Sequence, residues 1–147
     1  MRKFKERDLI GIWDYVAAFQ RFPDGHIVNQ FGDPPVGRFV ITCGGLYLHW
    51  VQRPDLPQIA SGRISLLTDA EAHAVAEGVL GHFGTWEADE QAGTFTVQIQ
   101  KASFANFDGI SQVRVVTKLT RHELEYENLT SVGGAGVVVV AQLRRVG

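Results

Sequence analysis

The fold is decided by the stretch Leu9-Ile-Gly-Ile-Trp-Asp-Tyr-Val-Ala-Ala-Phe19. Residues alternate over positions 9–20 closely enough to predict a β-strand. One face, which we expect to point inward, carries Trp13, Tyr15, Ala17 and Phe19. A tryptophan near the start of a first strand can cap a hydrophobic interior that later strands surround. We therefore interpret Gly11-Ile12-Trp13 as the plug that closes one end of a small β-barrel.

The composition is that of a globular protein that can bury a core. The chain has 147 residues, of which 45% are hydrophobic and 20% are charged. The formal net charge of −2 provides no basic field that would attract nucleic acid or an anionic membrane surface. Cys43 is the only cysteine, so an internal disulfide and a cysteine-based zinc cluster are excluded.

Targeting and membrane signals are absent from the sequence. The N-terminus is charged through Asp8, and it contains no apolar signal-peptide core. No stretch approaches the roughly 20 apolar residues of a membrane-spanning helix. We therefore expect a cytoplasmic protein without a membrane span. The chain contains no linker or repeat, which predicts one domain over 1–147, and the choice between monomer and homodimer stays open.

Further strands follow at hairpin spacing. Gly44-Gly45 is a two-residue turn between strands expected at 37–43 and 46–53. A second hairpin is expected from strands at 83–88 and 94–100. The remaining expected strands cover 26–31, 112–120, 123–129 and 137–146.

One helix is expected in the middle of the chain. Thr68, followed three residues later by Glu71, forms a capping box, which predicts a helix over about 68–80 that Gly81 ends. This helix should either pack on the sheet or cover it as a lid. Sequential hairpins with a single helix favour an all-β fold, a single antiparallel up-and-down β-barrel of about eight to nine strands with one inserted α-helix.

The inward face of the strand over 46–53 decides which residues can contact a ligand. The expected inward face is the apolar one, with Leu46, Leu48 and Trp50. The alternative is a ligand-lining face with Tyr47 and His49, and periodicity alone does not decide between them.

The strand over 112–120 poses the same question. Either Gln112, Arg114 and Val116 point inward, or Arg114 lies outside beside Lys118. In the next strand, three glutamates alternate along one face, which predicts that they are solvated and that Tyr126 lies inside.

Several motifs, spread over nearly the whole chain, suggest a family. They are Leu9-Ile-Gly-Ile-Trp13, Arg53-Pro-Asp-x-Pro57 with Ala60-Ser-Gly62, Phe83-Gly-Thr-Trp-Glu-x-Asp89 with Gly93-Thr94, Asn106-Phe107, Gly109 and Gln112-x-Arg114. In these residues the chain resembles the bacterial and fungal lipocalin-like domain family. The resemblance implies a calycin-type barrel with a cavity for a small organic molecule. It also implies that an arginine of the last strand, Arg145 or Arg144, stacks on Trp13 at the closed end.

The candidate catalytic residues are Arg114, His49 and Tyr126. An arginine inside an apolar barrel is costly unless it meets a carboxylate or an anionic ligand, so an inward Arg114 would hold a carboxylate or enolate oxygen. An inward His49 would be a general acid or base near neutral pH, and Tyr126 a proton donor. None of the 5 histidines has metal-ligand spacing with a carboxylate, so we expect no metal site and no cofactor.

Three functions are compatible with such a barrel. The first is a binding module for a small hydrophobic or amphiphilic molecule. The second is a cofactor-free isomerase, cyclase or lyase of secondary metabolism, and the third is a non-catalytic interaction domain with a filled barrel. Titratable groups that converge on one void would favour the enzyme, whereas an apolar void would favour binding. The expected ligand-binding residues are Tyr15, Phe19, Trp50, Trp86, Gln98, Phe104, Phe107, Gln112 and Tyr126.

Overall fold

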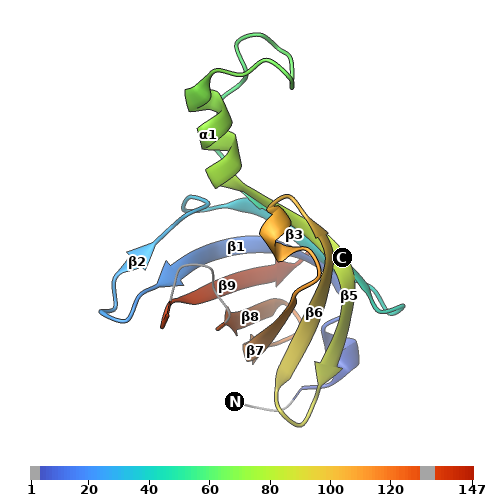
Figure 1. Cartoon of the computed structure of the whole chain (residues 1–147). Coiled ribbons are helices and arrows are strands. Elements are labelled where there is room, and N and C mark those ends of the chain that lie inside the picture. Colours follow the sequence, from blue (N-terminus) through green and yellow to red (C-terminus); the bar gives the residue numbers. More distant parts are fainter. Residues whose placement is uncertain (1–3, 130–134) are drawn as a thin grey trace.

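A computed structural model gives the positions of residues 4–129 and 135–147. The elements are η1 (Glu6–Asp8), β1 (Gly11–Arg21), β2 (Ile27–Val28), β3 (Val36–Ile41), β4 (Leu46–Gln52), α1 (Asp69–Gly78), β5 (Val79–Asp89), β6 (Thr94–Ala102), η2 (Ala105–Phe107), β7 (Ser111–Leu119), β8 (Glu123–Asn128) and β9 (Val138–Arg145). One antiparallel sheet closes on itself, because β1 pairs with both β3 and β9 (Figure 1). Within the described residues, eight strands close the barrel, and the short β2 pairs antiparallel with the last residues of β1. This confirms the expected up-and-down barrel with one helix.

A β-bulge changes the inward face of β1 halfway along the strand. The register between β1 and β9 shifts between Tyr15 and Ala17, so Val16 is the extra residue. Tyr15 points inward as expected, but beyond the bulge the buried residue is Ala18. The inward positions expected for Ala17 and Phe19 are therefore wrong, because a bulge shifts the two-residue alternation by one position.

The inward face of β4 is also the opposite of the expected one. Tyr47 and His49 are buried in the barrel. The apolar residues that we expected inside lie on the outer surface, namely Leu46, Leu48 and Trp50, with exposed fractions of 56%, 54% and 47%. The Trp50 ring packs outside across β5, where a Cβ on Gly81 would come within 2.5 Å of it. Apolar packing on the outer surface therefore mimics the pattern of a core face.

Helix α1 begins as expected and ends early. Thr68 Oγ1 accepts the N–H of Glu71 at 3.2 Å, and the Glu71 carboxylate accepts the N–H of Thr68 at 2.8 Å, which completes the capping box. The helix ends at Gly78 instead of Gly81, because residues 79–80 pair with β4 and begin β5.

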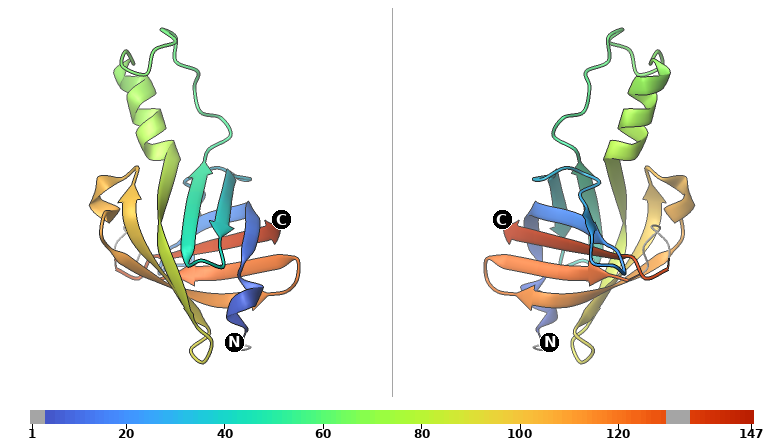
Figure 2. Two further views of the ribbon diagram at one scale, coloured as in Figure 1. Left: turned by 90° about the vertical axis from the view of Figure 1, so that its right-hand side faces the viewer. Right: turned by 90° about the vertical axis from the view of Figure 1, so that its left-hand side faces the viewer.

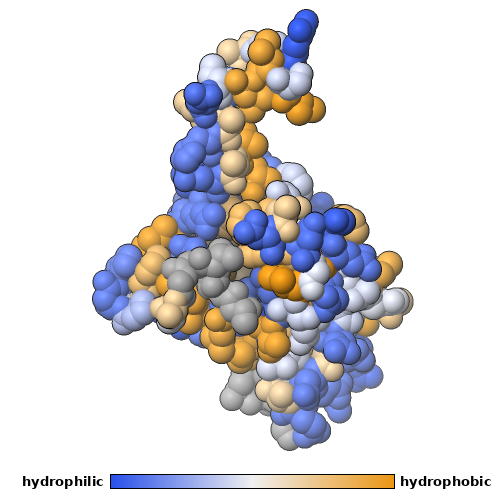
Figure 3. Space-filling model, viewed as in Figure 1, coloured by the Kyte–Doolittle hydropathy of each residue, from blue (hydrophilic) through white to orange (hydrophobic). Residues whose placement is uncertain are grey.

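Helix α1 and the loop before it project from one end of the barrel (Figures 1 and 2). Gly78 is the only buried residue of this helix. The loop carries exposed apolar residues, including Ile64 (98%) and Leu66 (58%). Figure 3 shows hydrophobic residues, in orange, at the tip of this projection. The helix therefore does not pack along the sheet as expected, and only its last turn, with Ala76 and Glu77, reaches the barrel interior.

The end of the barrel that holds η1 is closed by Trp13 and Arg145. Arg145 Cζ lies 4.1 Å from the centre of the fully buried Trp13 ring, the stacking that the resemblance implies. The guanidinium also donates to three backbone oxygens, those of Asp8 (2.7 Å), Ile10 (2.7 Å) and Arg121 (2.8 Å). A Cβ on Gly11 would lie 2.3 Å from Arg145 Nη1, so the glycine before Trp13 provides the space for this contact.

We expect Trp13→Ala to lower the free energy of unfolding by about 3–5 kcal/mol, because it removes a fully buried aromatic ring. Trp50→Ala is the matched control, since its ring lies on the outer surface, and it should cost about 1 kcal/mol or less. Urea titrations of both variants measure the difference. Equal losses would contradict the assignment of Trp13 to the closed end.

Candidate functional site

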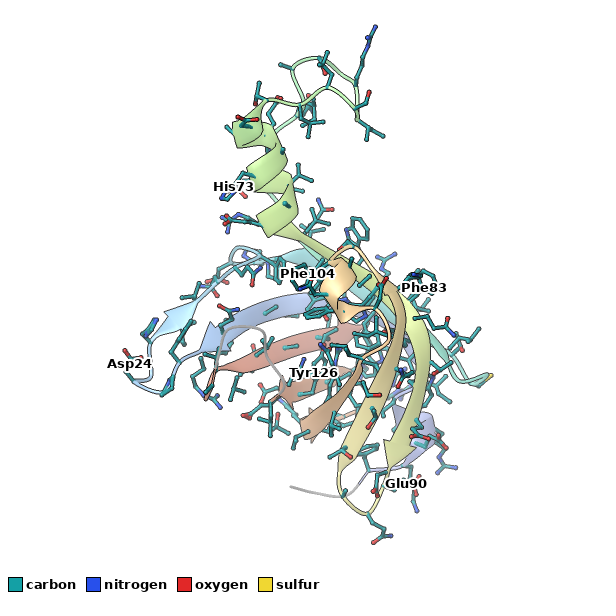
Figure 4. The ribbon with its side chains drawn as sticks, in the orientation of Figure 1. Asp24, His73, Phe83, Glu90, Phe104 and Tyr126 are labelled. Atoms are coloured by element: carbon teal, nitrogen blue, oxygen red, sulfur yellow. The ribbon has the colours of Figure 1, made fainter. Side chains whose placement is uncertain are left out.

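The barrel contains a cavity of about 300 Å³ at the end from which α1 projects. Its apolar lining includes Val51, Leu80, Phe104, Phe107, Val139 and Ala141. Figure 4 shows Tyr126 inside the barrel and Phe104 at the end nearer to α1. The cavity is therefore built from strands, from the η2 segment and from the last turn of α1.

Arg114 projects into this cavity from β7. Gln112, Arg114 and Val116 form the inward face of that strand, which resolves the question left open by the sequence. Arg114 is only 3% exposed. Its Nη1 donates to Tyr126 Oη at 2.9 Å, and its Nη2 donates to Gln112 Oε1 at 2.9 Å. Its Nε has no hydrogen-bond acceptor among the described residues.

A chain of hydrogen bonds runs from Arg114 to His49 through two tyrosines. Tyr126 Oη and Tyr15 Oη are 3.0 Å apart, and Tyr15 Oη is in short contact with His49 Nε2. A guanidinium can only donate, so Tyr126 accepts from Arg114. The simplest consistent assignment then has Tyr126 donating to Tyr15 and Tyr15 donating to His49 Nε2. In this assignment His49 carries its proton on Nδ1.

His49 stacks on a second buried histidine. His49 and His82 face each other across β4 and β5, with ring centres 4.3 Å apart and planes inclined by 14°. Tyr47 Oη is hydrogen-bonded to His82 Nδ1 at 2.8 Å. The stack therefore extends the polar cluster from β4 to the neighbouring strand β5.

Burial keeps this cluster uncharged apart from Arg114. Desolvation lowers the pKa of His82 to about 3, helped by the nearby charge of Arg114. The pKa of His49 is lowered well below its ordinary value, first by desolvation and then by His82 and Arg114. Desolvation also raises the pKa of Tyr15 well above its ordinary value. Both imidazoles are neutral near pH 7, so they can accept a proton but hold no positive charge.

Within residues 4–129 and 135–147, no buried carboxylate balances the charge of Arg114. The buried polar residues of the described chain are His49, His82, Gln112, Arg114 and Asn128, and none of them is acidic. Asn128 Nδ2 donates to Gln112 Oε1 at 3.2 Å, which leaves this amide oxygen shared between two donors. Among the described residues that line the cavity, Glu77 is the one acidic residue, and its side chain is 69% exposed and lies 3.0 Å from His73.

Comparison with known proteins assigns the family. A family model described as a lipocalin-like domain matches residues 10–135. The chain belongs to the lipocalin-like domain family. Among curated proteins, none matches the chain at the required significance. This lipocalin-like barrel is similar to two designed proteins of known structure. The first is a redesigned beta barrel, at 13% identity and a TM-score of 0.46, with 96% of this chain and 94% of that chain covered. The second is a de novo designed fluorescence-activating beta barrel, at 12% identity and a TM-score of 0.47, with 95% of each chain covered.

Across residues 4–129 and 135–147, no group of three or more potential metal ligands is found. In the same residues, no helix combines the length and the apolar character that crossing a membrane requires.

The expected site residues divide into two groups. Those that line the cavity are Tyr15, His49, Phe104, Phe107, Gln112, Arg114 and Tyr126. Phe19, Trp50, Trp86 and Gln98 do not line it. Phe19 and Trp50 face outward, as described above.

Trp86 and Gln98 are kept from the cavity by other contacts. Trp86 is buried, but its indole Nε1 donates to Thr42 O at 2.9 Å, beside the turn between β3 and β4. Gln98 is on the outer face of β6, where its amide donates to Gly109 O at 3.1 Å and accepts from Ser111. The inward position expected for Gln98 is wrong because Val97 and Ile99 occupy that face.

His82 was missed by the sequence analysis for an identifiable reason. The expected strand began at position 83, whereas β5 begins at Val79. With the earlier start, His82 is an even number of residues before the buried Trp86 and therefore shares its face. The alternation that places Tyr126 inside places Asn128 on the same face, but Asn128 was not among the expected site residues.

The buried histidines predict a stability that decreases in mild acid. Because the pKa of His82 is about 3 in the folded protein and 6.5 ordinarily, below about pH 6.5 the unfolded chain binds a proton that the folded protein does not. The free energy of unfolding should therefore fall as the pH decreases, with a slope that approaches about 1.4 kcal/mol per pH unit for each such histidine. Urea titrations between about pH 6.5 and about pH 5 measure this slope above the range in which carboxyl groups titrate.

His82→Gln should reduce that slope by up to about 1.4 kcal/mol per pH unit, the contribution of one proton, since it removes one of the two buried imidazoles. His73→Gln is the control, because His73 is on the exposed surface of α1. A slope unchanged in His82→Gln would mean that His82 is not held neutral by burial.

Proposed function

We propose that this lipocalin-like barrel binds a small amphiphilic molecule in its central cavity. The supporting observation is the combination of an apolar wall with one compact polar cluster around Arg114. Ligand sites typically combine a mainly apolar lining with a few polar groups that fix orientation. An apolar body would lie against Val51, Leu80 and Phe107, and a polar end would face the cluster.

The cavity volume argues against the barrel serving only as a filled scaffold. About 300 Å³ is at the small end of the range for ligand pockets, so the occupant is a compact molecule or a short chain. Phe104, with 43% of its surface exposed, contacts the buried Phe107 edge to face in the segment around η2. This aromatic pair would contact the ligand near the open end.

N-phenyl-1-naphthylamine, a neutral apolar fluorophore, should bind to the protein with enhanced fluorescence. Val139→Trp, which fills the cavity, should weaken this binding at least tenfold, or about 1.4 kcal/mol. Val113→Trp is the matched control, since Val113 is 44% exposed outside the barrel. The proposal fails if the fluorophore does not bind or if both variants bind it equally. Native mass spectrometry of the purified protein would identify a co-purified ligand.

A second function, cofactor-free acid–base catalysis, is favoured by the convergence of Arg114, Tyr126, Tyr15 and His49 on one cavity. In the assigned network Tyr15 donates to the neutral His49 Nε2, so Tyr15 can pass its proton to His49 and take one from a bound molecule. Arg114 would stabilise negative charge that develops on a substrate oxygen. This arrangement suits an isomerase, a cyclase or a lyase that moves a proton next to a carbonyl group.

Deuterium incorporation tests the catalytic function. The molecule extracted from the purified protein is incubated in D₂O with fresh protein, and mass spectrometry follows the gain of deuterium on carbon. We expect His49→Gln to slow this exchange about 100-fold, the contribution of a general base. His73→Gln should leave the exchange rate unchanged. Exchange no faster than in buffer would exclude this function for that molecule and leave the binding function untouched.

A further inference from the structure

We propose that the polar end of the cavity's ligand is a single carboxylate, which binds at Arg114. This inference rests on the proposed binding function and specifies the chemical class of its ligand. It follows from the charge balance of the cavity, the hydrogen-bond balance of the polar cluster and the shape of the lining.

The charge balance leaves one positive charge without a partner. Arg114 is the only charged residue among the buried residues of the described chain. Other arginines meet an acid or backbone oxygens: Arg38 lies 2.6 Å from Asp14, and Arg21 lies 2.8 Å from Glu127. Burying a charge is strongly unfavourable unless it is paired, so a buried guanidinium that faces a cavity favours an anionic occupant.

The hydrogen-bond balance indicates the same kind of ligand. Arg114 Nε and His49 Nδ1 are the two buried side-chain atoms of the described residues that have no partner. In the tautomer assigned above, both carry a proton, so the cluster lacks acceptors and has donors to spare. Gln112 Oε1 already accepts from two donors, Arg114 Nη2 and Asn128 Nδ2, so it has little capacity left for a third. A ligand that supplies acceptor oxygens matches this deficit.

The available charge limits the ligand to one negative charge. The neighbouring imidazoles are neutral, and the ring faces of Tyr126 and Phe39 pack against the guanidinium at 4.9 Å and 5.4 Å. A dianionic phosphate would bring more charge into this apolar setting than one arginine can balance. A planar carboxylate matches the fork of a single guanidinium in both charge and geometry.

A matched series of ten-carbon chains separates charge from hydrophobicity. Decanoate, decanol and decylamine, each below its micelle concentration, compete with bound N-phenyl-1-naphthylamine near pH 7.5. We expect decanoate to compete at least ten times more strongly than decanol, and decylamine to compete least. Equal competition by decanoate and decanol, with the fluorophore still displaced, would overturn this inference and leave the binding function intact. If the fluorophore and all three chains fail to bind, the binding function itself fails.

Two substitutions assign the charge preference to Arg114. Arg114→Met keeps the approximate length of the side chain and removes the charge, so the ratio of decanoate to decanol competition should fall to about one while the fluorophore still binds. Arg21→Met is the matched control, since Arg21 is outside the cavity, and it should keep the wild-type ratio. If Arg114→Met does not fold, Arg114→Lys keeps the positive charge and should retain a preference for decanoate over decanol. A wild-type ratio in Arg114→Met, or no preference in a folded Arg114→Lys, would overturn the assignment.

Discussion

The structure depends on the closure of a sheet whose first strand has two neighbours. β1 pairs with β3 and also with β9, so the two ends of the chain meet at one place in the wall. Arg145 reinforces this seam, because it lies on the Trp13 ring and donates to backbone oxygens of the N-terminal segment and of the turn before β8. A sealed end of this kind confines the free interior volume to the opposite end, where the long loops and α1 lie.

Two arginines inside one small barrel illustrate the difference between a structural and a functional charge. Arg145 has an aromatic partner and three carbonyl acceptors, so each of its three nitrogens has a partner without a ligand. Arg114 is buried more deeply, yet its acceptors are one hydroxyl and one shared amide oxygen, and its Nε has none in the described residues. The stability of the barrel explains Arg145 fully. For Arg114, the carboxylate that we propose as an occupant of the cavity would supply the missing partner.

The sequence predicted the architecture because turns and caps depend on local chemistry. The capping box of Thr68 and Glu71 and the hairpin turns set the order of elements, and the Gly-x-Trp segment indicated which end closes. The inward faces depend on tertiary packing, so they were less predictable. One bulge residue, Val16, reversed the face of the second half of β1.

The apolar pattern of β4 was misleading for a different reason. Its large apolar residues are on the outer surface, and the interior positions hold Tyr47 and His49, whose polar atoms find partners only in strands distant in sequence. Hydrophobicity cannot identify an inward polar residue when its partner is unknown, as for His49 and His82. The inward position of Arg114 could not be decided from the sequence for the same reason, since Tyr126 is on another strand.

The polar cluster also links ligand binding to the basicity of His49. Desolvation is the largest cause of its low pKa, and the charge of Arg114 is a smaller one. An anion at Arg114 would offset the smaller cause, but it would also displace water and leave the larger one in place. His49 would therefore remain neutral in the complex, and a proton from a bound molecule could reach its Nε2 through the hydroxyl of Tyr15, which donates to that nitrogen. The same occupant that balances Arg114 would thus leave His49 uncharged, so anion binding and proton transfer through Tyr15 are compatible in this cavity.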